Sequence, residues 1–201
     1  MKKWAVLGFT ALAAVSTSLA ESKFPMRVDI DVSSKTRMEK MGAGMDGEVK
    51  VEKVQLRVKV RKSGGSNSAD PVTAELYVIG KQLQTGYYGV IDVIKQEHHF
   101  DSKNDNSFEF ESKMYSLPRT SGNVNVGGTY ETYLVVIADK DGAVIDARSG
   151  RHIKDKGIAF IRELGPKTLF DRDGNVIGKF KPNREGFSAA AAAAMNPGNN
   201  Y

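Results

Sequence analysis

Apolar and polar residues alternate with a period of two along most of this chain, which is the pattern of β-strands with one buried and one solvent-facing side. The alternation is clearest over residues 48–61. Val49 and Val51 have the opposite parity from the apolar residues that follow, so we predict a bulge or a bend at residues 52–53 that transfers the strand between faces. The later apolar positions are Val54, Leu56, Val58 and Val60.

Weaker versions of this pattern extend the β prediction through the chain. Residues 28–32 predict a short strand, whereas residues 33–47 lose the alternation and predict a long loop. The nearly continuous apolar run 133–138 is typical of a central strand buried on both faces. Leu117-Pro118 is expected to interrupt the strands. Further strands are predicted over residues 73–80, 89–100, 107–112, 130–139, 143–147 and 176–180.

Turn and helix signals separate the strands of the second half. Residues 139–142 and 171–174 both have the sequence Asp-x-Asp-Gly. This resembles the start of a calcium-binding loop, but neither segment continues with the further oxygen ligands that such a loop needs, so we interpret both as hairpin turns. Ile158, Ile161 and Leu164 recur at a spacing of three and predict one short helix near residues 153–164.

The order of these elements predicts a mainly β fold. Roughly eight short strands with frequent turn signals favour an antiparallel two-layer sandwich of the immunoglobulin-like kind, with the helix as an addition. A closed barrel has the same periodicity, so the pattern leaves both architectures open. We expect residues 21–181 to form this domain and residues 182–201 to be a disordered tail.

The beginning of the chain has the pattern of an export signal. Lys2 and Lys3 precede an apolar stretch over residues 4–15, and Ser18-Leu19-Ala20 provides the small residues of a cleavage site. We therefore expect residues 1–20 to be removed and the protein to reach the periplasm or cell surface of a bacterium, with no integral membrane segment after cleavage. The chain has no cysteine, which excludes disulfides, thiol catalysis and a lipid anchor on cysteine.

The charge balance gives no indication of a nucleic-acid partner. The formal net charge is +5, and loss of Lys2 and Lys3 would leave 27 − 24 = +3. The basic residues within 50–62 alternate with valine and leucine, which is typical of the solvated face of a strand. We expect no nucleic-acid binding.

Candidate metal ligands and catalytic groups are sparse. His98 and His99 are neighbours on a predicted strand and point to opposite faces, so a zinc site would need one of them together with His152 and a carboxylate. We expect no metal, no cofactor and no catalytic residues, hence no enzyme. A carboxylate pair for hydrolysis could come from the acidic residues of the strands, although alternating charges usually form the wet face. These residues are Asp92, Glu97, Glu109 and Glu111.

Tyr87 and Tyr88 are the best candidates for an exposed binding feature. They lie between Gly86 and Gly89, and the chain without residues 1–20 has no tryptophan on which a sugar ring could stack. One inward and one outward tyrosine is the favoured interpretation, because aromatic residues bury well in sandwiches.

Residues 107–164 resemble small exported immunoglobulin-like sandwich proteins of bacteria, some of them encoded near type IV pilus components. The resemblance depends on Phe108-Glu109-Phe110, Met114-Tyr115-Ser116, the strand 130–136 and the turn 139–142. It implies an interaction module of the surface or periplasm without a catalytic site, and it assigns no functional residue. A pilin-type membrane helix is absent, since the apolar run ends in a cleavage site.

These observations predict an exported, non-enzymatic sandwich module that binds an envelope or surface protein, including a second copy of itself through an edge strand. Two alternatives remain from the sequence: an envelope hydrolase that uses a metal or a carboxylate pair, and a carbohydrate-binding module that uses Tyr87 and Tyr88.

Overall fold

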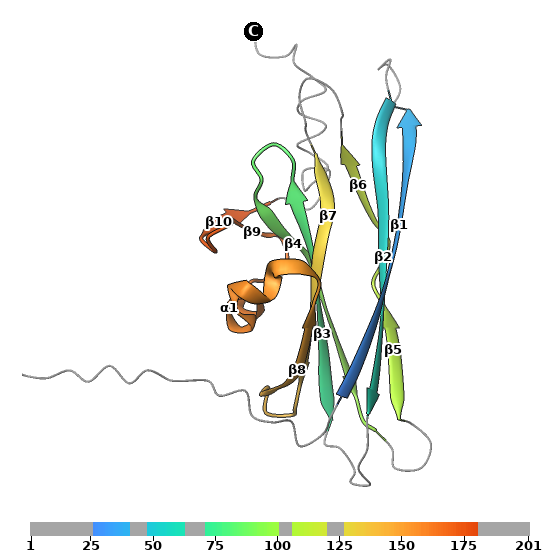
Figure 1. The fold of residues 1–201 in the computed structure, drawn as a ribbon, viewed down its shortest axis with the longest axis vertical. Helices are drawn as coiled ribbons and strands as arrows, with labels where there is room; N and C mark the ends of the chain where they lie inside the picture. The colour runs from blue at the N-terminus through green and yellow to red at the C-terminus, as the bar shows by residue number, and fades with distance from the viewer. Residues whose placement is uncertain (1–25, 41–47, 63–70, 101–105, 120–126, 181–201) are drawn as a thin grey trace, which may run out of the picture.

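Two antiparallel β-sheets pack face to face in the computed structural model, with a helical segment outside one of them (Figure 1). The structure describes residues 26–40, 48–62, 71–100, 106–119 and 127–180. The predicted signal at 1–20 and tail at 182–201 lie outside these ranges. Within them, no helix has the length and apolar character needed to cross a membrane.

The four-stranded sheet is built around one long hairpin. β1 pairs with β2 over its whole length, and the other side of β2 pairs first with β6 and then with β5. Ser112 lies between β5 and β6, and its backbone N–H and side-chain Oγ bind the backbone of Leu56 at 2.8 and 3.0 Å. The strands are β1 (Met26–Lys40), β2 (Glu48–Lys62), β5 (Ser107–Glu111) and β6 (Tyr115–Arg119).

The six-stranded sheet has the order β10-β9-β4-β3-β7-β8, and all its neighbours are antiparallel. β3 and β7 are its long central strands, which confirms the central strand predicted from the apolar run 133–138. The strands are β3 (Val72–Gln82), β4 (Tyr88–His98), β7 (Gly128–Ala138), β8 (Val144–Ser149), β9 (Thr168–Phe170) and β10 (Val176–Lys179).

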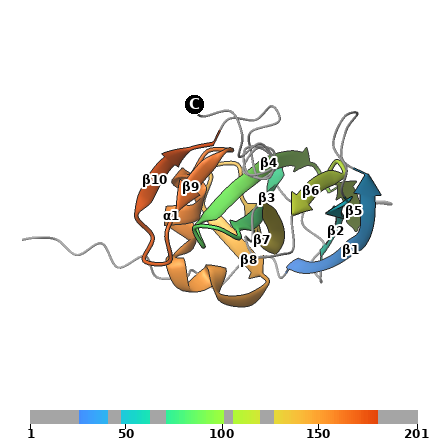
Figure 2. The same cartoon turned by 90° about the horizontal axis from the view of Figure 1, so that it is seen from above.

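The six-stranded sheet is covered on both faces, as the view from above shows (Figure 2). Leu76 and Val78 of β3 pack toward the four-stranded sheet, in one apolar cluster with Leu56 and Val58 of β2. The intervening residues of β3 pack toward the helical segment, formed by the 3₁₀ helix η1 (Arg151–Lys156) and the helix α1 (Ile158–Glu163). The predicted two-layer antiparallel sandwich with one short helix is therefore confirmed, and the described strands form two separate sheets rather than one closed sheet.

Two sequence predictions in the long hairpin are wrong. β1 continues to Lys40, so its residues 33–40 are strand and only 41–47 of the predicted loop lie outside the described residues. The pairing of β1 with β2 also runs through residues 52–53 without a register shift, so a bulge, one of the two alternatives predicted there, is wrong. Val51 is buried although its parity differs from that of Val54.

The expected interruption at Leu117-Pro118 is also wrong, since both residues belong to β6. Proline lacks a backbone N–H, but β6 has a continuous ladder only on the β2 side, so the missing donor is tolerated. With this strand and the division of the last hairpin into β9 and β10, the described residues contain ten strands.

Candidate interaction site

The longest exposed strand edge of the described residues belongs to β1. Its 15 residues pair with β2 on one side and with no described strand on the other. The remaining edge strands of the two sheets are β5, β6, β8 and β10, which have 5, 5, 6 and 4 residues. An unpaired edge presents backbone N–H and C=O groups that can bind a further strand, so its length sets how much partner backbone it can accept.

The short edges carry prolines or register shifts that hinder pairing with another strand, and β1 carries neither. Ser112 and Pro118 interrupt the edge formed by β5 and β6. A register shift occurs between Val176 and Gly178 in β10, and another in the β7–β8 ladder, where Ile145 of β8 is skipped between Val144 and Asp146. Bulges, prolines and short lengths are the usual protection of edges, whereas the β1–β2 ladder is regular from Met26 to Lys40.

The two faces of β1 differ in character. Every second side chain, beginning at Arg27, lies on the outer face of the sheet, and all but one of these residues are charged. On the inner face Val28, Ile30 and Val32 are only half-buried against the core, and Met38 remains 54% exposed. The charged residues of the outer face are Arg27, Asp29, Asp31, Lys35, Arg37 and Glu39.

The charged face continues across β2 and β5. Arg57 lies 3.2 Å from Glu109 and 2.5 Å from Glu111, and Arg61 lies 3.5 Å from Asp29. The basic residues of β2 are thus balanced by carboxylates on the neighbouring strands, which agrees with the predicted solvated face. The side chains of Glu109 and Glu111 are each 40% exposed, and both serve as ion-pair partners of β2.

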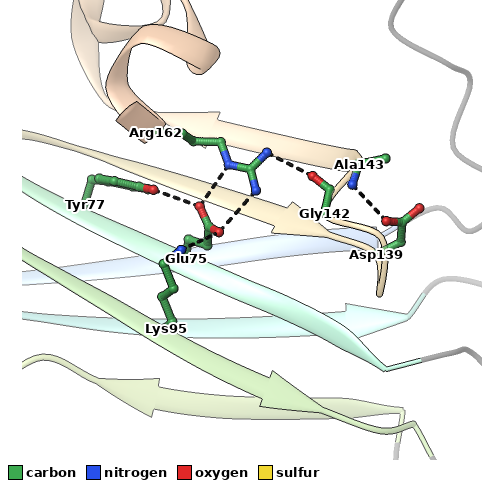
Figure 3. A network of polar contacts seen from close by, with 7 residues as sticks. All are labelled: Glu75, Tyr77, Lys95, Asp139, Gly142, Ala143 and Arg162. Carbon is green, nitrogen blue, oxygen red and sulfur yellow. Dashed lines mark hydrogen bonds and ion pairs between the residues drawn. The ribbon is translucent and has the colours of Figure 1, made fainter. Parts of the chain in front are cut away.

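A buried carboxylate that the sequence analysis did not single out lies beneath α1 (Figure 3). Glu75 projects from the centre of β3, and its side chain is 4% exposed. Its oxygens accept bonds from Arg162 Nε at 3.0 Å and Nη2 at 3.2 Å, from the Tyr77 hydroxyl at 2.8 Å and from Lys95 Nζ at 3.1 Å. A glutamate inside the apolar run of residues 72–79 was the available signal, because a charge in a buried strand requires partners.

The environment of Glu75 makes it an anchor rather than a proton donor. Burial alone would raise its pKa, but the bonds from Arg162, Tyr77 and Lys95 outweigh burial and hold the pKa below its ordinary value. Burial and the neighbouring carboxylate also raise the pKa of Tyr77. Both groups therefore keep fixed protonation states near neutral pH, and their effect is to tie α1 to the sheet.

The four candidate carboxylates are divided between the two sheets. Glu109 and Glu111 belong to β5 of the four-stranded sheet, whereas Asp92 and Glu97 belong to β4 of the other sheet. Asp92 accepts a hydrogen bond from the Tyr115 hydroxyl at 3.0 Å and lies 3.0 Å from Lys113 Nζ, so it links the two sheets.

The two candidate tyrosines have different surroundings. Tyr88 begins β4, stacks on Phe170 with ring centroids 5.5 Å apart and packs against the apolar cluster beneath α1. Lys81 Nζ lies 5.6 Å from its ring centroid. Tyr87 precedes the strand, is half-buried, and accepts a backbone bond from Gln82 in the turn. Tyr88 is thus the inward-packed residue of the pair, and binding by either tyrosine stays a prediction.

His98, the last residue of β4, and His99, which follows it, also have different surroundings. His98 stacks on Phe108 with centroids 4.4 Å apart and meets Phe100 edge-on at 4.9 Å. His99 is exposed, with its Nε2 3.7 Å from Glu97 Oε1. The side chain of His152 lies outside the described part of the structure. Among the side chains that are described, no group of three or more His, Asp or Glu residues could hold a metal ion.

The two Asp-x-Asp-Gly segments are turns, as predicted. Asp139 Oδ1 accepts the backbone N–H groups of Asp141 and Ala143 at 2.9 and 2.8 Å. Asp171 Oδ1 accepts those of Asp173 and Asn175, both at 2.8 Å. The carboxylates thus satisfy the backbone of their own hairpins, and bonds from Asn175 lower the pKa of Asp171.

No protein-family model matches the sequence, and no curated protein matches it either. Among solved structures, a match is a crystal structure from Akkermansia muciniphila, with 14% identity and a TM-score of 0.29, over 68% of this chain and 78% of that one. The immunoglobulin-like relation and the association with pili stay predictions.

Proposed function

We propose that this protein is an exported, non-enzymatic β-sandwich module of the bacterial envelope or surface, which binds another protein by accepting a strand on the free edge of β1. The export signal supports the location, and the long unprotected edge supports the mode of binding. The observation that carries the proposal is the contrast between β1, which is regular over 15 residues, and the short or interrupted edges elsewhere.

Strand addition gives affinity through backbone hydrogen bonds, and side chains on alternate positions give specificity. On β1 the charged outer face would select a partner by charge, whereas the half-buried valines and isoleucine on the inner face would become better covered. The partner would thus add cover to the apolar residues of β1 that the single chain leaves partly in water.

Proline substitution tests this mode of binding directly. Successive residues of an edge strand direct their N–H groups alternately toward the neighbour and toward the free side. One of the variants Ser33→Pro and Ser34→Pro therefore removes an outward N–H, while the other removes a bond to β2. We expect one variant to keep the melting temperature and lose capture of envelope proteins by the purified protein.

A matched control is Ser149→Pro in β8, an edge strand of the other sheet. If the fold-preserving proline variant of β1 captures the same envelope proteins as the wild type, strand addition at β1 is contradicted. Stoichiometric zinc or calcium in the purified protein would instead favour the hydrolase alternative.

A further inference from the structure

We propose that the strand added to β1 is β1 of a second copy of this chain, antiparallel and centred so that the two Ser33 residues lie opposite each other. This inference rests on the proposed function and names its partner. Ser33 is the middle residue of the 15-residue strand Met26–Lys40, so the whole length of both strands is paired. The two four-stranded sheets would then become one continuous sheet.

The charges of the outer face are arranged for this pairing. Two outer-face residues at the same distance from Ser33, one on each side of it, always carry opposite charges. In the centred antiparallel pair every charged side chain therefore lies opposite a charge of the other sign. The opposed pairs, each present twice, are Arg27 with Glu39, Asp29 with Arg37 and Asp31 with Lys35.

Neighbouring registers lose this complementarity. A shift of two residues in one direction places Arg27 opposite Arg37, and a shift in the other direction places Asp29 opposite Glu39. A shift of one residue would turn the charged face of one copy toward the core face of the other. A parallel pair of the same two edges would likewise place the charged face of one copy on the side of the core face of the other, because the copies would be related by a two-fold axis along the strands. Since like charges directly opposite each other are destabilising, the centred antiparallel register is favoured.

The inner face supports the same register. Val28 of each copy would lie opposite Met38 of the other, and Val32 opposite Ser34. Met38 is 54% exposed and Val28 is half-buried, so this contact would cover apolar surface that the single chain leaves in water. The pairing thus joins charged residues on one face and covers apolar residues on the other.

Within one chain β1 also carries contacts that the second copy would improve. Lys35 lies opposite Lys53 of β2, and Arg27 lies opposite Arg61. In a hairpin these like-charge pairs are unfavourable. The second copy would bring Asp31 to Lys35, which gains a partner of opposite charge, and Glu39 to Arg27, which already binds Asp29 at 3.1 Å and gains a second partner.

Charge reversal tests the pairing, with sedimentation velocity as the measurement. The complete 201-residue sequence is expressed so that any processing is carried out by the cell. We expect the wild-type protein to dimerise, and less strongly at high salt. Lys35→Asp replaces two attractive contacts per dimer by two repulsive ones, so it should weaken self-association roughly tenfold or more. It also sets an aspartate opposite Lys53, so the melting temperature should not fall.

A mixing experiment makes the test specific. Asp31→Lys should likewise abolish dimers, because the introduced lysine of each copy would face Lys35 of the other. When the Asp31→Lys and Lys35→Asp proteins are mixed, opposite charges face each other again, so a heterodimer should form. Lys179→Asp, the same change on the exposed edge strand β10, serves as the control and should dimerise like the wild type.

Cross-linking tests the register itself. Because the chain has no cysteine, Ser33→Cys introduces a single thiol that should face its counterpart and form a disulfide with a mild oxidant. Thr36→Cys is the control, since its counterpart would lie about 20 Å away at ~3.3 Å per residue.

Three results would overturn self-pairing: a wild-type protein that is monomeric at high concentration, a Lys35→Asp variant that dimerises like the wild type, or equal cross-linking of the two cysteine variants. If the wild type is monomeric but the proline variants still abolish capture of an envelope protein, self-pairing fails while the proposed function stands. If the fold-preserving proline variant still captures envelope proteins and still dimerises, both the proposed function and self-pairing are contradicted.

Discussion

The described residues cover the six-stranded sheet on both faces, whereas they form an apolar core on only one face of the four-stranded sheet. Adjacent residues of β3, such as Leu76 and Tyr77, are therefore both buried, one toward the four-stranded sheet and one toward α1. In β1 the apolar residues face the core and their neighbours are charged and exposed. The six-stranded sheet can thus serve as the rigid scaffold, while the four-stranded sheet presents a charged face and an open edge.

Carboxylates show the same contrast. Glu75 in the six-stranded sheet is almost fully buried and is held by three side chains. Glu111 in the four-stranded sheet is 40% exposed and binds Arg57 at the surface. A buried ion pair is costly to break because a charge is left without water or partner, whereas an exposed pair contributes little. Matched substitutions in the two sheets should therefore differ in their effect on stability.

Core truncation should show the largest difference between the sheets. Leu76→Ala in β3 removes a fully buried side chain and should lower the free energy of unfolding by about 3 kcal/mol. Ile30→Ala in β1 removes a half-buried side chain and should lower it by about 1 kcal/mol. Urea denaturation measures both. Equal losses would contradict the view that β1 contributes less to the core than β3.

Two arginines provide the corresponding comparison for ion pairs. Arg162→Ala leaves Glu75 buried with Lys95 and Tyr77 as its remaining donors, and should destabilise the protein by about 2 kcal/mol. Arg57→Ala removes an exposed partner of Glu109 and Glu111, and should change the stability by less than about 1 kcal/mol. Urea denaturation of both variants at one pH decides the point, and a larger loss for Arg57→Ala would reverse the comparison.

Acid should weaken the link between α1 and the six-stranded sheet. The pKa of Glu75 is lower in the folded protein than its ordinary value of 4.5. The unfolded chain therefore takes up this proton first, so the stabilisation is complete above pH 4.5 and is lost as the pH falls through the lower folded value. Glu75→Gln should be less stable at neutral pH but lose less stability between neutral pH and acid than the wild type. Equal losses in thermal melts would contradict this assignment.

A strand could be predicted from the sequence where at least one of its faces is buried in the core. Alternation identified β2, and the continuous apolar run identified β7, because burial dictates the residue type at those positions. The second half of β1 was missed because residues 33–40 are exposed or nearly so on both faces. There the strand exists through backbone bonds to β2, which leave no apolar pattern in the sequence.

The candidate site was harder to predict than the fold. The aspartate turns were recognisable from the sequence, because the Asp side chain accepts backbone N–H groups of the turn and Gly adopts the positive φ that a tight turn needs. The free edge depends on which strands are neighbours, and no local pattern reports that Ser112 and Pro118 interrupt one edge of the four-stranded sheet while β1 forms the other. Glu75 and Arg162 are far apart in sequence, so their pairing requires the placement of α1 over β3.

The smallest predicted effect concerns the turn between β7 and β8. Asp139→Ala removes the acceptor for the N–H groups of Asp141 and Ala143 and should destabilise the protein by about 1 kcal/mol, whereas Asp139→Asn keeps an acceptor oxygen and should cost less. Arg162 Nη1 donates to the carbonyl of Gly142 at 3.0 Å, so the turn also contacts the Glu75 network (Figure 3).

The double variant Asp139→Ala/Arg162→Ala measures whether turn and network act together. If the ordered turn positions the Gly142 carbonyl for Arg162, the two losses of unfolding free energy should sum to more than the loss in the double variant. Asp171→Ala combined with Arg162→Ala is the control, because its turn contacts neither Glu75 nor Arg162 among the described hydrogen bonds. Additive losses in both pairs would mean that the turn closes the hairpin without supporting the contact between Arg162 and Glu75. The position of α1 on the six-stranded sheet would then depend on Glu75 and the apolar cluster alone.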